Sequence, residues 1–297
     1  MVEYLKRLEW PELRKPVWVG AFIGWLDAQE GASRTIRYLV DQLHATRFAE
    51  LDPEDFYDFT AVRPYAYNDK EGRRVIRWPY NELFYWSSPE TETDLILFLG
   101  TEPSLKWRTY VETMMDVIES HGVEVVITLG SLMDAVPHTR DSLLSGNVNK
   151  EELKERLEGL RIMGGGYQGP VGITSVFTDA CTKRGLDCLS LWGHAPHYVQ
   201  RRANDKVVKA LTDRLNRLLG LTVPLDELER RAQTFEAEVT KAISSSIEVS
   251  AYVKRLERQY DSAQEKGEQL PSPQAMVEEM EEFLKRKRSE GDQFSSN

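Results

Sequence analysis

The sequence predicts a three-layer α/β/α domain, in which helices cover both faces of a mainly parallel, mixed sheet. Short apolar runs of strand length alternate with segments of helical periodicity as far as about residue 222. Strands separated by helices pair in parallel through right-handed crossovers, and such sheets are buried on both faces. The chain has 297 residues, 41% of them hydrophobic, which is enough for a sizeable core.

The first strand is predicted at Val17–Ile23, an almost wholly apolar run that Gly24 follows. A helix is expected from about Asp27 to Leu43, because apolar side chains recur there at helical spacing. They are Ala32, Ile36, Leu39, Val40 and Leu43. This strand, turn and helix form the first unit of the α/β alternation.

A β-hairpin is predicted after this unit. Phe56–Thr60 and Ala61–Tyr67 are both expected to be extended. The turn residues Asp69–Gly72 then separate them from Arg73–Trp78, which returns as the second hairpin strand. We expect this hairpin to add an antiparallel or mixed extension to the sheet.

Strands and helices continue to alternate beyond the hairpin. They are predicted at Asp94–Leu99, Trp107–His121, Val123–Leu129, Gly169–Arg184, Leu186–Trp192 and Lys206–Leu219. Pro170 favours the first turn of a helix, and Gly220 is a typical residue just after a helix end. The short apolar segment Leu160–Met163 is compatible with either type of element. Residues 1–222 are therefore predicted to form the α/β/α domain.

Residues 223–266 are predicted to form a C-terminal helical hairpin. Apolar residues follow a 3-4 spacing over Leu225–Ala242 and again over Val249–Tyr260, with Ser244–Ser246 between them. Ser245 and Glu248 have the spacing of a capping box. One long coiled coil is an alternative, and so is an apolar stripe that packs on the main domain. Residues 267–297 are expected to contain a linker, a short helix at about 274–288 and a frayed end.

Composition excludes several classes of function. Lys and Arg number 38 against 48 Asp and Glu, so the net charge is −10 and binding to nucleic acid or an anionic membrane is not expected. Cys181 and Cys188 are expected to be ordinary reduced thiols, and the basic run at 285–288 a solvated helix end. No apolar run approaches the ~20 residues of a membrane span. The N-terminal residues lack a secretory signal, so a cytoplasmic protein is expected.

Polar and aromatic residues follow the predicted strands, and ligands of parallel sheets bind outside the carboxyl ends of strands. The sequence therefore predicts a ligand-binding cleft or a partner surface at that edge. Its candidate residues are Trp25, Asp27, Glu102, Arg108, His138, Arg140, Tyr167, Trp192, His194 and His197. The alternative is a structural rim, in which Asp27 and Asp134 cap helices and the histidines are hydrogen-bonded into loops.

The chemistry of this edge is left open by the sequence. Glu102, His138 and His194 are the candidate catalytic residues, because His138 with Glu102 or Asp27 is suited to acid–base chemistry. There is no phosphate-binding or dinucleotide-binding motif, and Ser131 lacks the glycines of a hydrolase elbow. The pair His194 and His197 does not have the helical spacing of zinc peptidases. No metal or cofactor is expected.

An ordered series of short motifs runs from about residue 14 to 260. It comprises Gly24-Trp25-x-Asp27, Phe56-Tyr-Asp-Phe59, Arg63-Pro64, Arg77-Trp78-Pro79, Gly100-Thr-Glu102-Pro103, Trp107-Arg108, Leu129-Gly130, Val136-Pro-His-Thr-Arg140, Tyr167-Gln-Gly-Pro-Val-Gly-Ile173, Ser190-Leu-Trp192, Ala195-Pro-His-Tyr-Val199 and Tyr252-Val-x-x-Leu-Glu257. With these motifs the chain resembles the longer bacterial members of the PAC2 family, which is named after a proteasome assembly chaperone.

This resemblance implies a core similar to that of purine nucleoside phosphorylases, self-association and protein binding, and it implies no particular reaction. The chain ends in Phe294-Ser-Ser-Asn297, so docking into proteasome pockets by a hydrophobic–Tyr tail is not expected. Our first hypothesis is a cytoplasmic, chaperone-like assembly scaffold that forms homo-oligomers with unidentified protein partners. The alternative is a small-ligand-binding protein or a phosphorylase- or hydrolase-like enzyme, in which Trp25 and Trp192 stack a ring in the cleft.

Overall fold

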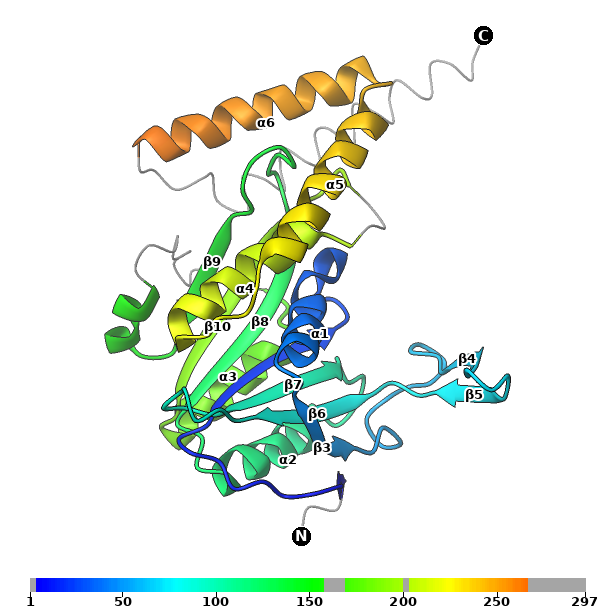
Figure 1. Ribbon diagram of the computed structural model, residues 1–297, viewed down its shortest axis with the longest axis vertical. Helices are drawn as coiled ribbons and strands as arrows, with labels where there is room; N and C mark the ends of the chain where they lie inside the picture. The colour runs from blue at the N-terminus through cyan, green and yellow to red at the C-terminus, as the bar shows by residue number, and fades with distance from the viewer. Residues whose placement is uncertain (1–3, 158–168, 200–202, 267–297) are drawn as a thin grey trace.

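A mixed sheet forms the centre of the protein, in the strand order β1-β3-β6-β7-β2-β8-β10-β9 (Figure 1). The computed structural model describes residues 4–157, 169–199 and 203–266. In chain order the strands of this sheet are β1 (Leu5–Arg7), β2 (Val17–Ile23), β3 (Thr46–Leu51), β6 (Asn81–Trp86), β7 (Leu95–Thr101), β8 (Val125–Asp134), β9 (Leu144–Val148) and β10 (Asp187–Pro196).

The centre of the sheet is parallel and its borders are antiparallel. β7, β2, β8 and β10 pair in parallel, whereas β1, β3 and β6 pair antiparallel on one side and β9 pairs antiparallel on the other. β3 points in the same direction as the four central strands, so five of the eight strands share one direction. The predicted mainly parallel, mixed sheet is confirmed.

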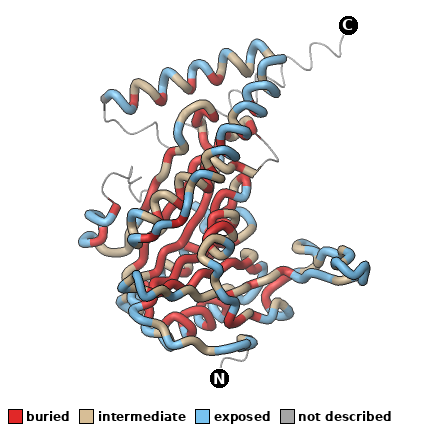
Figure 2. Tube along the Cα trace, viewed as in Figure 1, coloured by how far each residue is buried: buried red, intermediate tan, exposed pale blue. Residues whose placement is uncertain are grey.

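Helices cover both faces of the sheet, as predicted. α1 (Gly31–Gln42) and α4 (Asp205–Leu219) pack on one face, and α2 (Trp107–Ser120) and α3 (Ile173–Arg184) pack on the other. β2 illustrates the reason, because Val19 belongs to the core under α1 and α4 while Trp18 belongs to the opposite core. Successive side chains of a strand point to opposite faces, so an all-apolar strand must be covered on both. Figure 2 shows the buried interior that results.

The central strands lie where the apolar runs predict them, but two are longer. β8 continues to Asp134 and β10 continues to Pro196, with parallel pairing up to their last residues. Polar residues such as Ser131 and His194 therefore sit on the strands themselves and not in loops. Backbone pairing is independent of side-chain polarity, so an apolar run marks only the buried part of a strand.

Strands β1, β3, β6 and β9 do not have a buried apolar run, and they were not predicted from the sequence. They lie at or near the borders of the sheet, where one side of a strand stays partly exposed and its sequence is mixed. The extended segment predicted at Phe56–Thr60 is wrong. These residues form turns, the first closed by the Phe56 amide, which donates to the Pro53 carbonyl.

The predicted β-hairpin exists, but it does not extend the main sheet. β4 (Tyr65–Asn68) and β5 (Arg74–Arg77) form a separate two-stranded sheet that projects from the body of the protein (Figure 1). The Asp69 backbone and side chain close its turn by accepting hydrogen bonds from Glu71, Gly72 and Arg73. The antiparallel part of the main sheet comes instead from β1, β3, β6 and β9.

Two helices begin later than predicted. Gln29 and Glu30 have left-handed backbone angles, with φ of 51° and 55°, so a short 3-10 turn (Ala28–Glu30) precedes α1 and the α-helix starts at Gly31. α3 starts at Ile173 and not at Gly169. A second 3-10 segment, Glu151–Leu157, was not predicted. Leu160–Met163 and the helix expected at 274–288 lie outside the described residues.

The C-terminal residues form two helices, α5 (Asp226–Ile243) and α6 (Ile247–Lys266), and not one continuous coiled coil. α5 lies along α4, and α6 turns back from it at residues 244–246 (Figure 1). Ser246, and not Ser245, accepts the hydrogen bond from the Val249 amide at the start of α6. The apolar side of α5, including Leu228 and Phe235, is buried on the same chain. Among the described helices, none has the length and apolar character needed to cross a membrane.

Candidate functional site

The carboxyl ends of β2, β7, β8 and β10 meet at one side of the sheet, which we call the strand-end edge. Parallel register fixes this arrangement, since Ile23 pairs with Thr101 and Pro196 pairs with Asp134. Asp27, which follows β2, makes an isolated parallel bridge with Ser131 of β8. The turns that carry the predicted site residues therefore emerge on a common border, as the sequence analysis requires.

Asp27 is buried at the start of α1. Its Oδ1 accepts hydrogen bonds from the backbone amides of Ala32 at 2.9 Å and Ser33 at 3.1 Å, so the carboxyl group caps the first turn. Burial is the main reason that the pKa of Asp27 is raised. Its contacts are those of a helix cap, which was the structural alternative for this residue.

Gln29 is a buried residue of the strand-end edge that was not among the predicted site residues. Its side-chain amide donates to the carbonyls of Pro196, at 2.9 Å, and Val199, and its Oε1 accepts from the Asn204 side chain. The Asn204 Oδ1 in turn accepts from the first amides of α4. Gln29 thus connects the start of α1, the end of β10 and the cap of α4. No local pattern marks such a residue.

Glu102, Trp25 and Arg108 lie on the β2 and β7 side of the edge. The Glu102 Oε1 accepts a hydrogen bond of 2.9 Å from the Ile173 amide, so this carboxylate sits at the N-terminus of α3. Trp25 is 66% exposed, and Arg108 is also exposed. Within the described residues, no hydrogen bond joins any of the three to His138 or His194. Glu102 and His138 are thus not hydrogen-bonded to each other, and acid–base chemistry by this pair stays a prediction.

His194 connects β10 to its two neighbouring strands. Its Nδ1 lies 2.5 Å from Asp134 Oδ2 on β8, and its Nε2 lies 2.8 Å from Ser145 Oγ on β9. His194 and both partners are buried. His197 directly follows β10. Its Nδ1 lies 2.9 Å from the Asp134 carbonyl oxygen, and its Nε2 lies 3.4 Å from the Tyr252 hydroxyl of α6.

His138 lies in the loop of residues 135–143, which we call the edge loop. The Tyr198 hydroxyl is 2.8 Å from both the backbone amide and the Nδ1 of His138, and the Thr240 Oγ1 of α5 is 3.0 Å from Nε2. Burial, followed by the nearby Lys206 ammonium, lowers the pKa of His138 to about 4. The ring is therefore neutral at physiological pH and connects Tyr198, two residues after β10, to α5.

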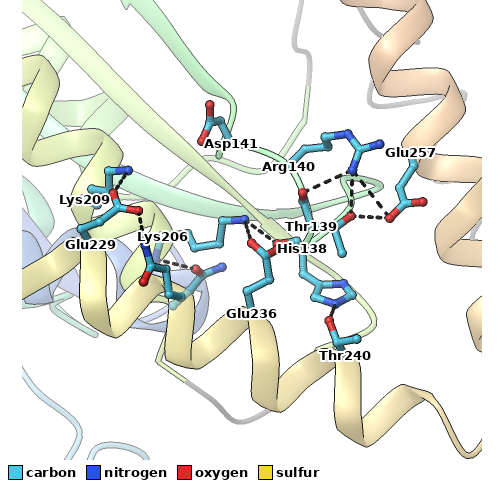
Figure 3. A network of polar contacts seen from close by, with 12 residues as sticks. His138, Thr139, Arg140, Asp141, Lys206, Lys209, Glu229, Glu236, Thr240 and Glu257 are labelled. Atoms are coloured by element: carbon cyan, nitrogen blue, oxygen red, sulfur yellow. Dashed lines mark hydrogen bonds and ion pairs between the residues drawn. The ribbon is translucent and has the colours of Figure 1, made fainter.

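Arg140 joins the edge loop to α6. Its Nε and Nη2 each lie 2.8 Å from a carboxylate oxygen of Asp261. Its Nη1 lies 3.8 Å from Glu257 (Figure 3). Thr139 donates to the same Glu257 at 2.5 Å, and the Tyr260 hydroxyl donates to the Asp141 carbonyl. The two bonds from Arg140 to Asp261 have the planar two-point geometry that Arg prefers with carboxylates.

Lys206 and Lys209 make the corresponding contacts between α4 and α5. The Lys206 Nζ lies 2.6 Å from the His138 carbonyl and 2.6 Å from Glu236, and Lys209 forms an ion pair with Glu229 (Figure 3). The edge loop, α4, α5 and α6 are thus linked by one polar network, which we call the clasp. It comprises Lys206, Glu236, Lys209, Glu229, His138, Tyr198, Thr240, Thr139, Arg140, Glu257 and Asp261.

The two remaining candidates are Trp192 and Tyr167. Trp192 is half-buried on β10 and lies against Gly130 of β8, where an added Cβ would come within 2.4 Å of its ring. No ring contact between Trp192 and Trp25 is present in the described part of the chain. Tyr167 lies outside the described residues.

The chemistry of the strand-end edge is dominated by internal bonding. Both ring nitrogens of His138, His194 and His197 have a partner in the protein. Proton transfer to a ligand needs a ring nitrogen within hydrogen-bond reach of that ligand, so these bonds would first have to open. Within residues 4–157, 169–199 and 203–266, no group of three or more His, Cys, Asp and Glu side chains is placed to hold a metal ion.

Two cavities lie beside α4, and none of the predicted cleft residues lines them. One, of about 420 Å³, is lined by Ala203, Asp205, Arg230, Arg231, Thr234, Phe235 and Glu238. The other, of about 350 Å³, is lined by Arg34, Arg37, Tyr38, Asp41, Gln42, Asp205, Val208, Glu227, Leu228 and Arg231. Some of their charges pair with one another, as in the contacts of Arg34 with Asp205 and of Arg231 with Glu227.

A family model described as the PAC2 family matches residues 21–243, which is more than half of the chain. The chain belongs to the PAC2 family. The match ends where α5 ends, so α6 and its contacts to the edge loop lie beyond it. Curated proteins give no match to the chain.

Solved PAC2 structures resemble the protein over most of its length. A PAC2 family protein from Streptomyces avermitilis is 38% identical, with 80% of this chain and 99% of that chain covered and a TM-score of 0.72. A proteasome-assembly chaperone homologue from Mycobacterium tuberculosis is 32% identical, with the same coverage and TM-score. An archaeal proteasome activator from Pyrococcus furiosus, 23% identical with 80% and 97% covered and a TM-score of 0.65, shares the fold.

Several PAC2 site residues had no signal in the sequence. Thr240, Glu257 and Asp261 complete the clasp from helices that are distant in sequence, and an amphipathic pattern gives no information about which loop such a helix covers. Tyr198 is the exception, because it belongs to the motif Ala195-Pro-His-Tyr-Val199. The prediction that succeeded is the common border, which follows from parallel pairing alone.

Proposed function

We propose that this protein acts in the cytoplasm as an assembly-chaperone-like, protein-binding member of the PAC2 family, which binds proteasome subunits and associates with itself. The observation that carries the proposal is the 32% identity to the Mycobacterium tuberculosis proteasome-assembly chaperone homologue across 99% of that chain. A relationship of this extent covers the whole fold and not one motif. The name of the archaeal proteasome activator points to the same class of partner.

The strand-end edge offers the surface for such a partner. Large apolar side chains are exposed there: Trp25 after β2, Leu105 after β7, Met133 near the end of β8 and Val171 before α3. The contacts of adjacent residues keep these turns together, since Leu26 packs against Gly172 and Gln29 reaches the Met133 sulfur. Exposed apolar side chains grouped at one edge favour protein binding, and bonded histidines do not favour proton transfer.

The test is direct binding to the proteasome α- and β-type subunits of the source organism. Purified protein is titrated with each separately purified subunit by calorimetry, and the rate of subunit assembly is followed by native mass spectrometry with and without the protein. Binding to a subunit and a faster rate of assembly are expected. Trp25→Ser should weaken binding roughly tenfold or more, because a Trp at the centre of an interface contributes a large share of its affinity.

The matched control is Ile247→Ser, which removes another exposed apolar side chain at the start of α6. It should leave subunit affinity unchanged. The proposal fails if the protein neither binds a subunit nor alters the rate of assembly. The assignment of the binding surface fails if Trp25→Ser and Ile247→Ser have the same effect.

A further inference from the structure

Residues 60–78, which contain β4 and β5, form an arm that stands away from the body of the protein (Figures 1 and 2). None of these residues is buried, and both faces of the two-stranded sheet are open to solvent. An uncovered two-stranded hairpin is only marginally stable in water. Contact with a second surface would therefore stabilise the arm.

The arm carries apolar side chains on both faces. Tyr65 and Ile76 are 70% and 55% exposed and point to opposite faces, because Tyr65 pairs with Arg77 whereas Ile76 pairs with Ala66. Trp78 at the base is also exposed, although its ring makes an edge contact with Phe59. Large side chains that remain exposed on a projecting element are typical of contact surfaces.

The arm is basic, although the whole chain is acidic. Its charged residues are Arg63, Lys70, Arg73, Arg74 and Arg77 against Asp69 and Glu71. Arg73 pairs with both acids, and five cations against two acids leave the arm with a net charge of +3. Within the described part of the chain, Arg63, Lys70 and Arg74 form no ion pair. The covering surface should therefore present carboxylates.

Such a surface exists at the base of the arm, in the acidic segment of residues 50–58. This segment contains Glu50, Asp52, Glu54, Asp55 and Asp58 and no basic residue. Lys6 and Arg47 pair with Glu50, and Lys106 pairs with Asp55. Asp52, Glu54 and Asp58 are exposed, and no cation of the described residues pairs with them. The acidic segment and the arm thus have opposite and uncompensated charges.

We propose that the arm of one copy docks on the acidic segment of a second copy through the face of the hairpin that carries Tyr65 and Arg77. Within one chain no ion pair joins the two surfaces in the described residues, because the arm points away from its own base (Figure 1). Two copies satisfy both surfaces at once. This contact rests on the self-association in the proposed function and names the surfaces that produce it.

The first test replaces the apolar side chains of the arm. Tyr65→Ser/Ile76→Ser should reduce the mass in sedimentation equilibrium from that of an oligomer to that of one chain, with an unchanged circular dichroism spectrum because neither residue belongs to the core. Ile247→Ser is the matched control and should keep the oligomer. Added salt should weaken the association of the unaltered protein, since exposed charges are screened.

The second test changes the charge of the acidic segment. Asp52→Asn/Glu54→Lys should also give single chains, while Glu152→Gln/Glu155→Lys, which changes the net charge equally at another exposed site, should not. Asn at position 52 retains an acceptor for the Glu54 amide. Mixing the two monomeric variants is decisive, because one intact arm then meets one intact acidic segment and a dimer containing one copy of each variant should form.

The proposal is overturned if either double variant keeps the mass of the unaltered protein, or if the mixture stays monomeric. A protein that is already monomeric overturns it together with the self-association, but leaves subunit binding standing. Arm variants that keep their mass but lose affinity for proteasome subunits also overturn it, because the arm then covers a different protein. Trp25→Ser should leave the mass unchanged, which separates the two surfaces.

Discussion

Tyr198 holds His138 at two points, through its backbone amide and through its ring. The hydroxyl oxygen accepts the backbone N–H, so the hydroxyl hydrogen is available to Nδ1. This assigns the neutral tautomer with hydrogen on Nε2, which donates to Thr240. A proton added to Nδ1 would displace the Tyr198 hydrogen in a buried place beside the Lys206 ammonium. The edge loop is therefore built around an uncharged histidine.

This arrangement predicts a loss of stability in acid. The unfolded chain binds a proton at His138 near pH 6.5, but the folded chain does so only near pH 4, so the stabilising effect is complete above pH 6.5 and declines as the pH falls towards 4. The contribution amounts to ~3 kcal/mol of unfolding free energy. His138→Gln should flatten this part of the pH dependence, measured by urea denaturation between pH 7.5 and pH 4.5.

His44→Asn is the control, since His44 is exposed and its positive φ of 53° is one that Asn tolerates. It should preserve the pH dependence of the unaltered protein. Equal acid sensitivity in His138→Gln and the unaltered chain would remove His138 as its source.

The individual site residues also mark the limit of sequence reasoning. Parallel strands bring Asp27, His194 and their neighbours to one border, and this much follows from the order of strands. Whether such residues bond to a ligand or to each other depends on helices that enter from elsewhere, as Thr240 and Asp261 do. The shared ligand cleft stays a prediction, whereas the helix-capping alternative for Asp27 agrees with its hydrogen bonds.

At the scale of elements, three central strands carry a glycine beneath an aromatic ring. A Cβ at Gly20 of β2 or Gly100 of β7 would collide with Trp18 or Phe98 two residues earlier, and one at Gly130 of β8 would collide with Trp192. The rings lie flat across the sheet under α2 and α3. Close packing of this kind fixes the order and spacing of the parallel strands.

Gly130→Ala should therefore destabilise the fold by about 1–3 kcal/mol, the usual cost of an extra carbon in a packed core. Trp192 sits directly over Gly130 in the register of β8 and β10, so the ring has to move or the strands have to separate. Urea denaturation measures the change in unfolding free energy.

A double-mutant cycle supplies the control for this substitution. Once Trp192→Ala has removed the ring, Gly130→Ala should cost much less than it does in the unaltered protein. An equal cost in both backgrounds would show that the ring is not the obstacle.

The same packing explains which elements the sequence could predict. Central parallel strands are covered on both faces, so β2 and the buried parts of β7, β8 and β10 appear as apolar runs. Strands near a border need only one apolar face, and β3 and β6 accordingly read as mixed sequence. The start of α1 was misplaced because left-handed angles at Gln29 and Glu30 depend on tertiary bonds and not on local preference.

At the scale of the whole molecule, the C-terminal helices complete the domain. α5 buries Leu228, Phe235 and Val239, and the clasp connects both helices to the strand-end edge. Deleting residues 224–297 should lower the melting temperature by roughly 10 °C or more, because several buried side chains and their polar partners are lost. Differential scanning calorimetry measures the shift.

Deletion of residues 267–297 is the matched truncation, since every described contact of α5 and α6 remains. It should leave the melting temperature close to that of the full chain. An equally stable protein that ends at Val223 would contradict the view that these helices belong to the folded domain.

The clasp also sets the order in which a nascent chain can finish folding. The partners of Thr139 and Arg140 lie 118 and 121 positions later in the chain. Thr139 and Arg140 therefore leave the ribosome long before Glu257 and Asp261 are synthesised. The parallel sheet can form as soon as β10 has emerged, but its border stays uncovered until α6 has been made. During that interval, the growing polypeptide presents the very surface that chaperones recognise in unfinished proteins.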